Sequence, residues 1–366
     1  MARHLRTYRT ILKTFGPQLR PVGTFGLLQL HRLLNASTRG IDALLFSEVR
    51  KVAIERPVFI LGNPRSGTTF VHRFLLHTGE LCAFELWEML LPALTARAVF
   101  KPLIHRLAPL SPARYHSAAA HETSLRDVET DDAMAFFHFV DGGFLWSYFL
   151  AWDDQWGSDE SRRYFDPSRW DPAERDRLFG YLEACWRRNL VARHVDRNLV
   201  KSSMFTLCAA ELVRRYPDCR IIYLVRDPVQ TIPSGMSLLT GVIDQAYDMW
   251  NTTTVDARDR YLDNLYQASC HLYRAFHETK ASGAIPEDNL AIVSYPQLMS
   301  ELEPTMERLV DFAQLHPAAG FWDKVRQQAE HQRTRSSPHQ YSLDKFGLSA
   351  AKIRRDLAFV YDEYDV

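Results

Sequence analysis

The stretch ILGNPRSGTTF, residues 60–70, decides the fold. The apolar run 57–61 leads into it and predicts a buried strand, and residues 68–77 after it alternate apolar and polar side chains at helical spacing. A loop between a strand and a helix N-terminus offers several backbone N–H groups to one anion. Gly62 and Gly67 let the backbone curl close to that anion. We therefore expect an anion-binding glycine loop here.

The residue after the second glycine argues against a nucleotide triphosphatase. In that class the loop ends in Lys-Ser/Thr, because the lysine grips the outer phosphates and the hydroxyl holds magnesium. Here the loop ends Gly67-Thr68-Thr69, and Arg65 supplies the positive charge from inside the loop. An arginine stays charged and presents a planar fork to oxygen atoms. The loop predicts a phosphate-like ligand and no metal.

Strands that alternate with helices predict the fold class. Three more apolar runs are each followed by a helical pattern, and they cover residues 198–201, 219–225 and 290–295. This order predicts an α/β fold, a P-loop-like parallel sheet with helices on both faces. Residues 80–195 lack clear strands and predict a large helical insertion over the carboxyl edge of the sheet, where such sheets bind ligands. Within it, Pro172 is expected to begin a helix and residues 153–171 to form a surface loop.

Charge and cysteine content limit the class of partner and the compartment. Lys plus Arg equals Asp plus Glu at 44 each, so nothing favours a nucleic-acid partner. The five cysteines form no CxxC pair and are odd in number, which predicts buried thiols in a reducing, cytoplasmic compartment. The oligomeric state is not predicted.

The N-terminal segment is unevenly charged. Residues 1–40 carry seven Lys/Arg and no acid, with apolar residues between them and no run long enough to span a bilayer. We expect a basic amphipathic helical segment over residues 1–50, followed by a single domain over residues 51–366. Two interpretations of the segment remain open: a helical hairpin packed on the main domain, or a peripheral contact with the inner, anionic face of a membrane.

Two motifs together resemble a known family. The run Pro64-Arg65-Ser66-Gly67-Thr68-Thr69 resembles the 5′-phosphosulfate loop of the sulfotransferases that use 3′-phosphoadenosine 5′-phosphosulfate (PAPS). It is most similar to the branch that includes tyrosylprotein sulfotransferases and many bacterial enzymes. The run Leu224–Pro228, followed by Ser234, is similar to the family's 3′-phosphate site, where an arginine and a serine eight residues later bind the phosphate. The resemblance covers roughly residues 55–300.

The resemblance implies PAPS as cosubstrate. It would be held by the loop residues together with Arg226 and Ser234, and an aromatic residue at the position of Tyr295 lies near the nucleotide in similar enzymes. Read without the first motif, Arg226 and Ser234 would belong to an ordinary helix start capped by Asp227. Tyr295 could equally be a core residue.

Sulfuryl transfer needs a base for the acceptor proton and a cation for the leaving group. Lys201 ends a predicted strand, and similar family members carry a lysine there, usually before a proline that this chain lacks. Arg65 could share that work. Glu85 is the expected base, because it lies twenty residues after Arg65, near the spacing of the family's catalytic glutamate. Its apolar neighbours would partly desolvate it, which strengthens a base.

Other candidates for the base stay open. Glu88 lies one turn after Glu85, and the histidines to be weighed are His72, His121 and His138. An acidic cluster contains Glu129, Asp131 and Asp132. Without a histidine at ligand spacing we expect this cluster to be a helix start or a set of salt bridges, and we predict no metal.

The acceptor is expected to be hydrophobic. Residues 133–152, AMAFFHFVDGGFLWSYFLAW, are rich in aromatic residues, and they form either helical core or an apolar pocket. The sequence thus predicts direct in-line transfer from PAPS to a hydroxyl of a small, lipid-like molecule. The alternatives are a P-loop kinase or NTPase with Asp227 as the magnesium ligand, and a non-catalytic nucleotide-binding module.

Overall fold

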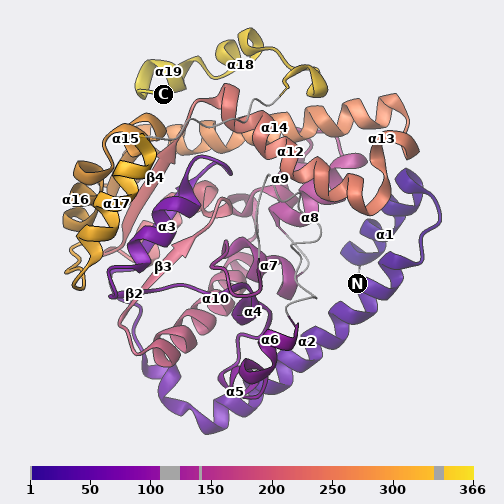
Figure 1. Ribbon diagram of the computed structural model, residues 1–366. Helices are drawn as coiled ribbons and strands as arrows, with labels where there is room; N and C mark the ends of the chain where they lie inside the picture. Colours follow the sequence, from indigo (N-terminus) through magenta and orange to yellow (C-terminus); the bar gives the residue numbers. More distant parts are fainter. Residues whose placement is uncertain (1, 108–123, 140–141, 334–341) are drawn as a thin grey trace. The chain divides into compact units, whose positions relative to one another are not determined.

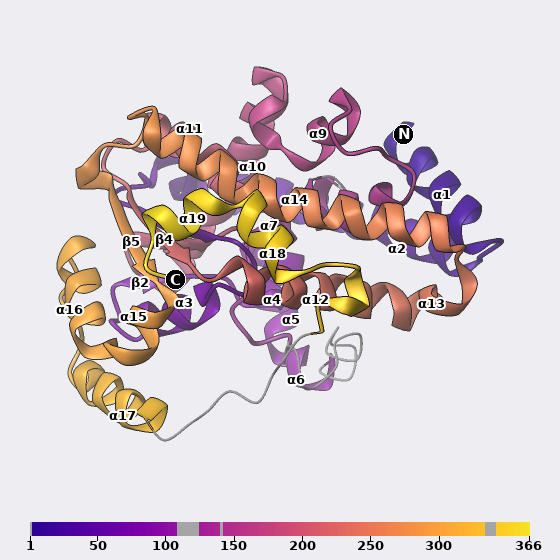
Figure 2. The ribbon, with the colours of Figure 1, turned by 90° about the horizontal axis from the view of Figure 1, so that it is seen from above.

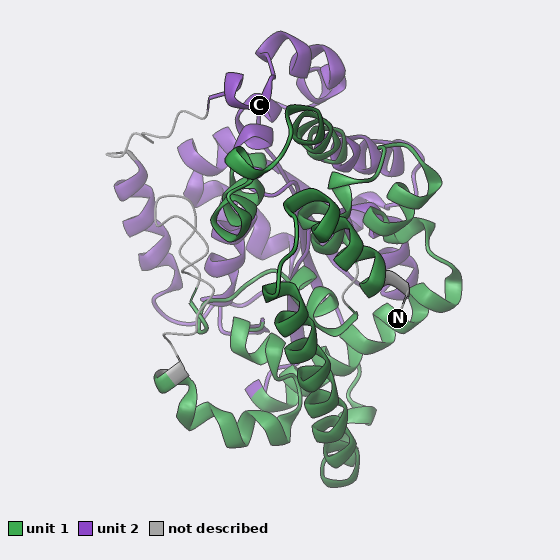
Figure 3. Cartoon of the chain, turned by 90° about the vertical axis from the view of Figure 1, so that its right-hand side faces the viewer, with its two compact units in different colours: residues 1–53, 84–192, 236–268 green, residues 54–83, 193–235, 269–366 purple. Residues whose placement is uncertain are grey.

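The computed structural model describes residues 2–107, 124–139, 142–333 and 342–366 (Figure 1). The chain forms two compact units, each assembled from three stretches of sequence (Figure 3). Unit 1 contains residues 1–53, 84–192 and 236–268, and unit 2 contains residues 54–83, 193–235 and 269–366. The boundary expected near residue 50 stays a prediction.

Unit 2 is built on a five-stranded parallel sheet, so the predicted fold class is confirmed. The strands are β1 (Val58–Gly62), β2 (Leu81–Cys82), β3 (Arg197–Lys201), β4 (Arg220–Val225) and β5 (Leu290–Ser294), in the order β2-β3-β1-β4-β5. Four of the five lie within one residue of the predicted runs. Strand β2 was not predicted, because two residues are too few to show a period.

The register brings the ends of the strands to one edge. Gly62 of β1 lies opposite Leu224 of β4, and Val225 lies opposite Ser294 of β5. The Ser202 amide, just after β3, donates to the Ile60 carbonyl at 3.2 Å. Because the strands are parallel, the segments that follow β1, β3, β4 and β5 all leave the sheet at this edge.

Helices cover both faces of the sheet, as predicted. On one face a shared apolar core joins Ile60 and Leu224 to α3 (Thr68–Leu76), α15 (Tyr295–Ser300), α16 (Leu302–Phe312) and α17 (Phe321–Arg333). Figures 1 and 2 show α15, α16 and α17 grouped beside the strands. On the other face Phe59 meets Phe205 of η7 (Met204–Cys208), with ring centroids 6.3 Å apart. There Tyr223 stacks at 3.5 Å on Phe276 of α14 (Val255–Ala281).

The remaining helices of unit 2 lie after β3, after β4 and at the C-terminus. They are α11 (Ala209–Arg215), the first part of α12 (Pro228–Tyr247), α18 (Ala350–Asp356) and α19 (Ala358–Glu363).

Unit 1 is helical in its described residues. Its helices include α1 (Ala2–Phe15), α2 (Arg20–Leu45), α4 (Leu86–Leu90), α5 (Leu94–Phe100), α6 (Ile104–Leu107), α7 (Asp132–Phe139), α8 (Gly143–Tyr148), α9 (Asp159–Phe165), α10 (Pro172–Arg193) and α13 (Met249–Thr252). The second half of α12 and the first half of α14 also belong to it. The prediction of a helical stretch over residues 80–195 is thus confirmed for its described part except for strand β2, and its position over the sheet edge stays a prediction.

One local prediction within this stretch is right and one is wrong. Helix α10 begins at Pro172 as expected. The surface loop expected over residues 153–171 contains α9, because the Ser158 hydroxyl accepts the Ser161 amide at 3.1 Å and caps that helix. All five cysteines are buried and unpaired with one another, as predicted.

Candidate functional site

The backbone of the glycine loop is fixed by close packing. Gly62 has φ +138°, and a Cβ at this position would lie 2.4 Å from the Leu224 carbonyl oxygen. Asn63 donates through Nδ2 to the Ser269 carbonyl at 2.9 Å, and the Ser66 hydroxyl donates to the Asn63 carbonyl at 2.7 Å. The two glycines and these bonds hold the turn after β1 in one conformation.

The framework leaves several loop amides without a hydrogen-bond partner among the described residues. Arg65 has φ +75° and Gly67, which precedes α3, has φ +100°. Left-handed backbone at a non-glycine residue costs free energy and recurs at ligand sites. Within the described residues, the amides of Arg65, Gly67, Thr68 and Thr69 donate no hydrogen bond. Several N–H donors beside one helix N-terminus suit an anion.

The two sequence motifs meet in unit 2. Arg65 Nε donates to the Ser234 hydroxyl at 3.1 Å, and Arg226 Nη1 donates to the Arg65 carbonyl at 3.1 Å. Ser234 is buried on the first part of α12, and Arg226 directly follows β4. The glycine loop and the β4–α12 turn therefore form one hydrogen-bonded array.

Arg226 is oriented by its surroundings. Its guanidinium lies over the Tyr295 ring, 3.9 Å from the centroid, and Nη2 donates to Gln230 Oε1 at 3.0 Å. The Tyr273 hydroxyl donates to the Arg226 carbonyl at 2.9 Å. Arg226 Nε is buried and has no hydrogen-bond partner among the described residues. It is a charged donor that an anion can satisfy.

Asp227 is used by the fold. Its Oδ1 accepts the Val229 amide at 2.9 Å and the Tyr361 hydroxyl of α19 at 2.7 Å. Burial, followed by the hydrogen bond to Asp227, raises the pKa of Tyr361. The helix start that the sequence suggested at Asp227 is present. The Asp227 carboxylate is engaged in hydrogen bonds there.

Lys201 lies at the edge where the glycine loop begins α3. It ends β3, is 6% exposed, and donates through Nζ to Thr69 Oγ1 at 3.1 Å. His72 is buried one turn further along α3. Burial and the charge of Lys201 hold the pKa of His72 well below its usual range, so His72 is a neutral packed residue.

Glu85 belongs to unit 1 and is the N-cap residue of α4. Its side chain accepts an amide of the first turn, and its Oε2 accepts Trp87 Nε1 at 2.8 Å. Glu88 Oε2 accepts the Glu85 amide at 2.9 Å, while Glu88 Oε1 pairs with Arg97 Nη1 at 3.5 Å. The buried Glu88 is thus engaged in structural contacts. The catalytic role of Glu85 stays a prediction.

The remaining alternative bases are His121 and His138. His121 lies outside the described residues. The His138 ring stacks on Tyr181 at 3.8 Å, and burial, helped by Arg39, lowers the pKa of His138 to about 3. A group with so low a pKa is a weak base.

The acidic cluster of unit 1 is a helix start, as expected. Asp132 begins α7 and accepts the Thr130 hydroxyl at 2.9 Å. Asp131 Oδ1 accepts Trp186 Nε1 at 3.1 Å.

The donor set of unit 2 fits a phosphorylated nucleotide. Three cations, Arg65, Arg226 and Lys201, share this edge of the sheet with the hydroxyls of Ser234 and Thr69. In the part of the chain that the structure describes, no carboxylate pairs with Arg65 or Arg226. Two neighbouring arginines without a carboxylate partner favour a polyanionic ligand.

Sequence reasoning missed several residues that support this set. Gln230 lies four residues after Arg226, in the first turn of α12, so its place near the start of the predicted helix could have found it. Thr206, which accepts the Gly62 amide at 3.1 Å, and Tyr273 come from distant parts of the chain. No local pattern marks them.

A parallel sheet with an anion loop after its central strand and an arginine after the next strand defines a class of proteins that bind phosphorylated nucleotides. The chain belongs to the sulfotransferase family, whose model matches residues 57–318. The family predicted from the two motifs is therefore confirmed, and membership supports an enzyme that transfers sulfuryl groups.

Two solved structures share the fold. Sulfotransferase STF1 from Mycobacterium tuberculosis H37Rv is 16% identical, with a TM-score of 0.71 over 98% of this chain and 90% of that protein. Sulfotransferase STF9 from Mycobacterium avium is also 16% identical, with a TM-score of 0.66 over 90% of this chain and 81% of that protein. No curated protein matches the sequence.

Proposed function

We propose that the protein transfers a sulfuryl group from PAPS to a hydroxyl of a hydrophobic, lipid-like acceptor. The observation that carries the proposal is the contact between the two motifs. Arg65 of the glycine loop bonds to Ser234, and Arg226 bonds to the loop backbone. One nucleotide with phosphates at both its 5′ and 3′ positions needs two neighbouring anion sites of this kind.

The donor nucleotide would be held entirely by unit 2. The loop amides and the hydroxyls of Thr68 and Thr69 bind the 5′-phosphosulfate, while Arg226 and Ser234 bind the 3′-phosphate. Tyr295 fixes the Arg226 guanidinium by stacking and borders the loop, since its ring lies 3.4 Å from a Cβ placed on Gly67. Bound PAPS supplies the activated sulfuryl group.

Separate residues would accept the proton of the acceptor and stabilise the charge of the leaving group. A bond forms between the acceptor oxygen and sulfur while the bond from sulfur to the 5′-phosphate oxygen breaks. Glu85 accepts the hydroxyl proton, and the Lys201 ammonium, with Arg65, stabilises the charge that grows on the leaving oxygen. The products are a sulfate ester and 3′-phosphoadenosine 5′-phosphate (PAP).

The surroundings of Glu85 support an apolar acceptor. Helix α4, which Glu85 caps, contributes Leu86 and Trp87 to an apolar cluster. Ile104 and Leu125 complete that cluster, and the partly buried Phe137, from the aromatic stretch, packs against it.

Transfer from 35S-labelled PAPS to a set of long-chain alcohols, sterols and phenols tests the proposal. Glu85→Gln should lower the transfer rate by about 10²–10⁴-fold, because the proton acceptor is lost. Calorimetry should show unchanged binding of PAP. Glu183→Gln, a change at a partly exposed acid paired with Arg187, serves as the matched control. Transfer at the full rate by Glu85→Gln would show that Glu85 is not the base.

The same calorimetry and transfer assay distinguish the proposed sulfotransferase from a P-loop kinase or NTPase and from a non-catalytic nucleotide-binding module. A P-loop kinase or NTPase would bind ATP–Mg better than PAP, but Thr68 stands where its lysine belongs and Asp227 is occupied by its helix. A non-catalytic module would bind PAP and sulfate none of the acceptors.

A further inference from the structure

Helix α2 is attached to unit 1 by a polar face. Its two fully buried residues are Asn35 and Asp42. Asn35 Nδ2 donates to the Leu90 carbonyl at 2.9 Å. Asp42 accepts Arg188 Nε at 2.7 Å and the Leu94 amide at 2.8 Å. An ordinary surface helix buries its apolar face instead.

The opposite face of α2 is apolar and exposed to solvent. We call this face the α2 stripe, and its members are Leu19 (88% exposed), Leu27 (69%), Leu30 (64%), Leu33 (65%), Leu34 (38%), Ile41 (46%), Leu44 (83%) and Leu45 (65%). At 100° per residue these side chains fall within a sector of about 120° that contains no charged residue. The stripe extends about 40 Å along the helix.

Basic residues lie at both ends of the stripe. Arg20 is exposed at the start of α2, and Arg50 and Lys51 are exposed just after its end. Glu48 is the one exposed acid described in residues 2–53. An apolar face with cations at its ends matches a lipid surface that carries negative charge.

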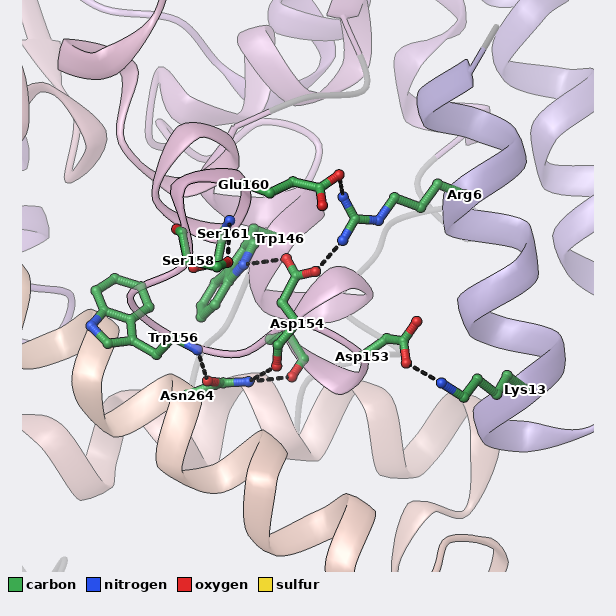
Figure 4. Close-up of polar contacts among 11 residues, drawn as sticks. Arg6, Lys13, Trp146, Asp153, Asp154, Trp156, Ser158, Glu160, Ser161 and Asn264 are labelled. Atoms are coloured by element: carbon green, nitrogen blue, oxygen red, sulfur yellow. Dashed lines mark hydrogen bonds and ion pairs between the residues drawn. The ribbon is translucent and has the colours of Figure 1, made fainter.

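Two cations of α1 form ion pairs within unit 1. Arg6 of α1 pairs with Asp154 and Glu160, and Lys13 pairs with Asp153 (Figure 4). Phe15 anchors the end of α1 by stacking on Tyr247 at 4.5 Å. These contacts hold α1 to unit 1, and the described exposed cations of the segment outside these ion pairs are then Arg9 of α1 and those at the ends of α2.

A second copy of the chain fits the stripe less well. In an antiparallel pair of α2 helices, Arg20 of one copy would approach Arg50 and Lys51 of the other. In a parallel pair, like ends would meet. Both arrangements bring cations together, which costs free energy at a contact.

We propose that the α2 stripe docks on an anionic lipid bilayer and lies in the plane of its surface. No helix in the described ranges has the length and apolar character needed to cross a membrane. A helix with one apolar face and basic ends instead settles at the boundary between headgroups and acyl chains. The proposal is independent of the donor and acceptor proposed above.

Flotation of the full chain with vesicles tests this docking. Vesicles of phosphatidylcholine alone are compared with vesicles that also contain phosphatidylglycerol. The variant Leu33→Ser/Leu44→Ser should reduce binding to the mixed vesicles by roughly tenfold or more, because each leucine contributes apolar area. The matched control Val255→Ser/Met299→Ser changes residues that are 58% and 37% exposed elsewhere in the chain, and it should bind as the wild type does.

The charge of the α2 ends has its own test. Arg20→Gln/Lys51→Gln should prefer the anionic vesicles less strongly than the wild type does, because two of the cations at the ends of α2 are removed, and the wild type should lose its preference at high salt. Circular dichroism of each variant checks that the fold is retained. Equal vesicle binding by the wild type and Leu33→Ser/Leu44→Ser would overturn the proposal. So would a wild-type dimer, seen by light scattering, that becomes monomeric in this variant and ignores vesicles.

Discussion

Arg226 uses its guanidinium for three contacts of different kinds. It stacks on Tyr295 at 3.9 Å, donates to the Arg65 carbonyl at 3.1 Å and donates to Gln230 at 3.0 Å. The buried Nε has no hydrogen-bond partner among the described residues. A lysine ammonium lacks the planar fork and cannot make the stacking contact while donating in fixed directions.

Arg226→Lys should therefore weaken PAP binding even though the charge is kept. The expected loss is about 1.5–3 kcal/mol, or roughly 10–150-fold in Kd, the range for hydrogen bonds to charged groups. Isothermal calorimetry measures it. Arg220→Lys is the matched control, because Arg220 at the start of β4 also lies over an aromatic ring, that of Phe312. Equal losses in the two variants would mean that PAP does not contact Arg226.

Gly62 is the residue of the loop that tolerates change least. Its φ of +138°, and the carbonyl oxygen that would lie 2.4 Å from an added Cβ, leave no room for a side chain. Gly62→Ala should lower the free energy of unfolding by about 3 kcal/mol or more, since both strain and overlap contribute. Gly180→Ala, in open space on α10, should instead raise it by about 0.5–1 kcal/mol. Urea denaturation of the two variants gives both values, and a Gly62→Ala protein as stable as wild type would contradict the loop geometry.

At the scale of elements, local patterns found the strands and some helix ends. Apolar runs marked four strands, and the signal at Pro172 marked the start of α10. Helix α9 was missed, because its capping serine precedes a charged stretch, Asp159-Glu160-Ser161-Arg162, that carries no apolar period. An apolar period in the sequence marks the buried face of a helix. A short helix on a charged surface has only a small buried face, so its sequence shows no such period.

The burial of Asp154 predicts a pH dependence of stability. Asp154 accepts Trp146 Nε1 at 3.0 Å and pairs with Arg6 (Figure 4). Burial raises the pKa of Asp154 to about 6, although Arg6 acts in the opposite direction. The folded state therefore binds this proton more tightly than the unfolded state, where the pKa is near 4.

Asp154 should thus stabilise the fold most below about pH 4, and this contribution should be lost as the pH rises through about 6. The expected change over that window is about 1–3 kcal/mol. Urea denaturation of the wild type and of Asp154→Asn, at intervals between these pH values, measures it. The difference between the two free energies of unfolding should change across the window and level off above it. A constant difference would contradict the raised pKa.

At the scale of the whole molecule, the sequence predicted the kind of fold better than its assembly. The glycine loop predicted the chemistry of its ligand, because loop, charge and missing lysine lie within one short run. The strand order and the meeting of Arg65 with Ser234 depend on pairing across 169 residues. Unit 1 consists of residues 1–53, 84–192 and 236–268. No local sequence pattern predicts that these three stretches pack together.

The proposed donor site lies wholly in unit 2. This location predicts which amides bound PAP will protect from hydrogen exchange. At a concentration of about 100 times its Kd, PAP should stabilise the state that it binds by about 2.7 kcal/mol. Hydrogen exchange should slow in the glycine loop, in the first turns of α3 and α12, and around Tyr273, while α2 and α10 of unit 1 stay unchanged. ATP–Mg at the same concentration is the control and should protect these amides less. Equal protection of α10 by PAP would show that unit 1 holds part of the donor site, because the loop and Arg226 would then be insufficient to bind the nucleotide.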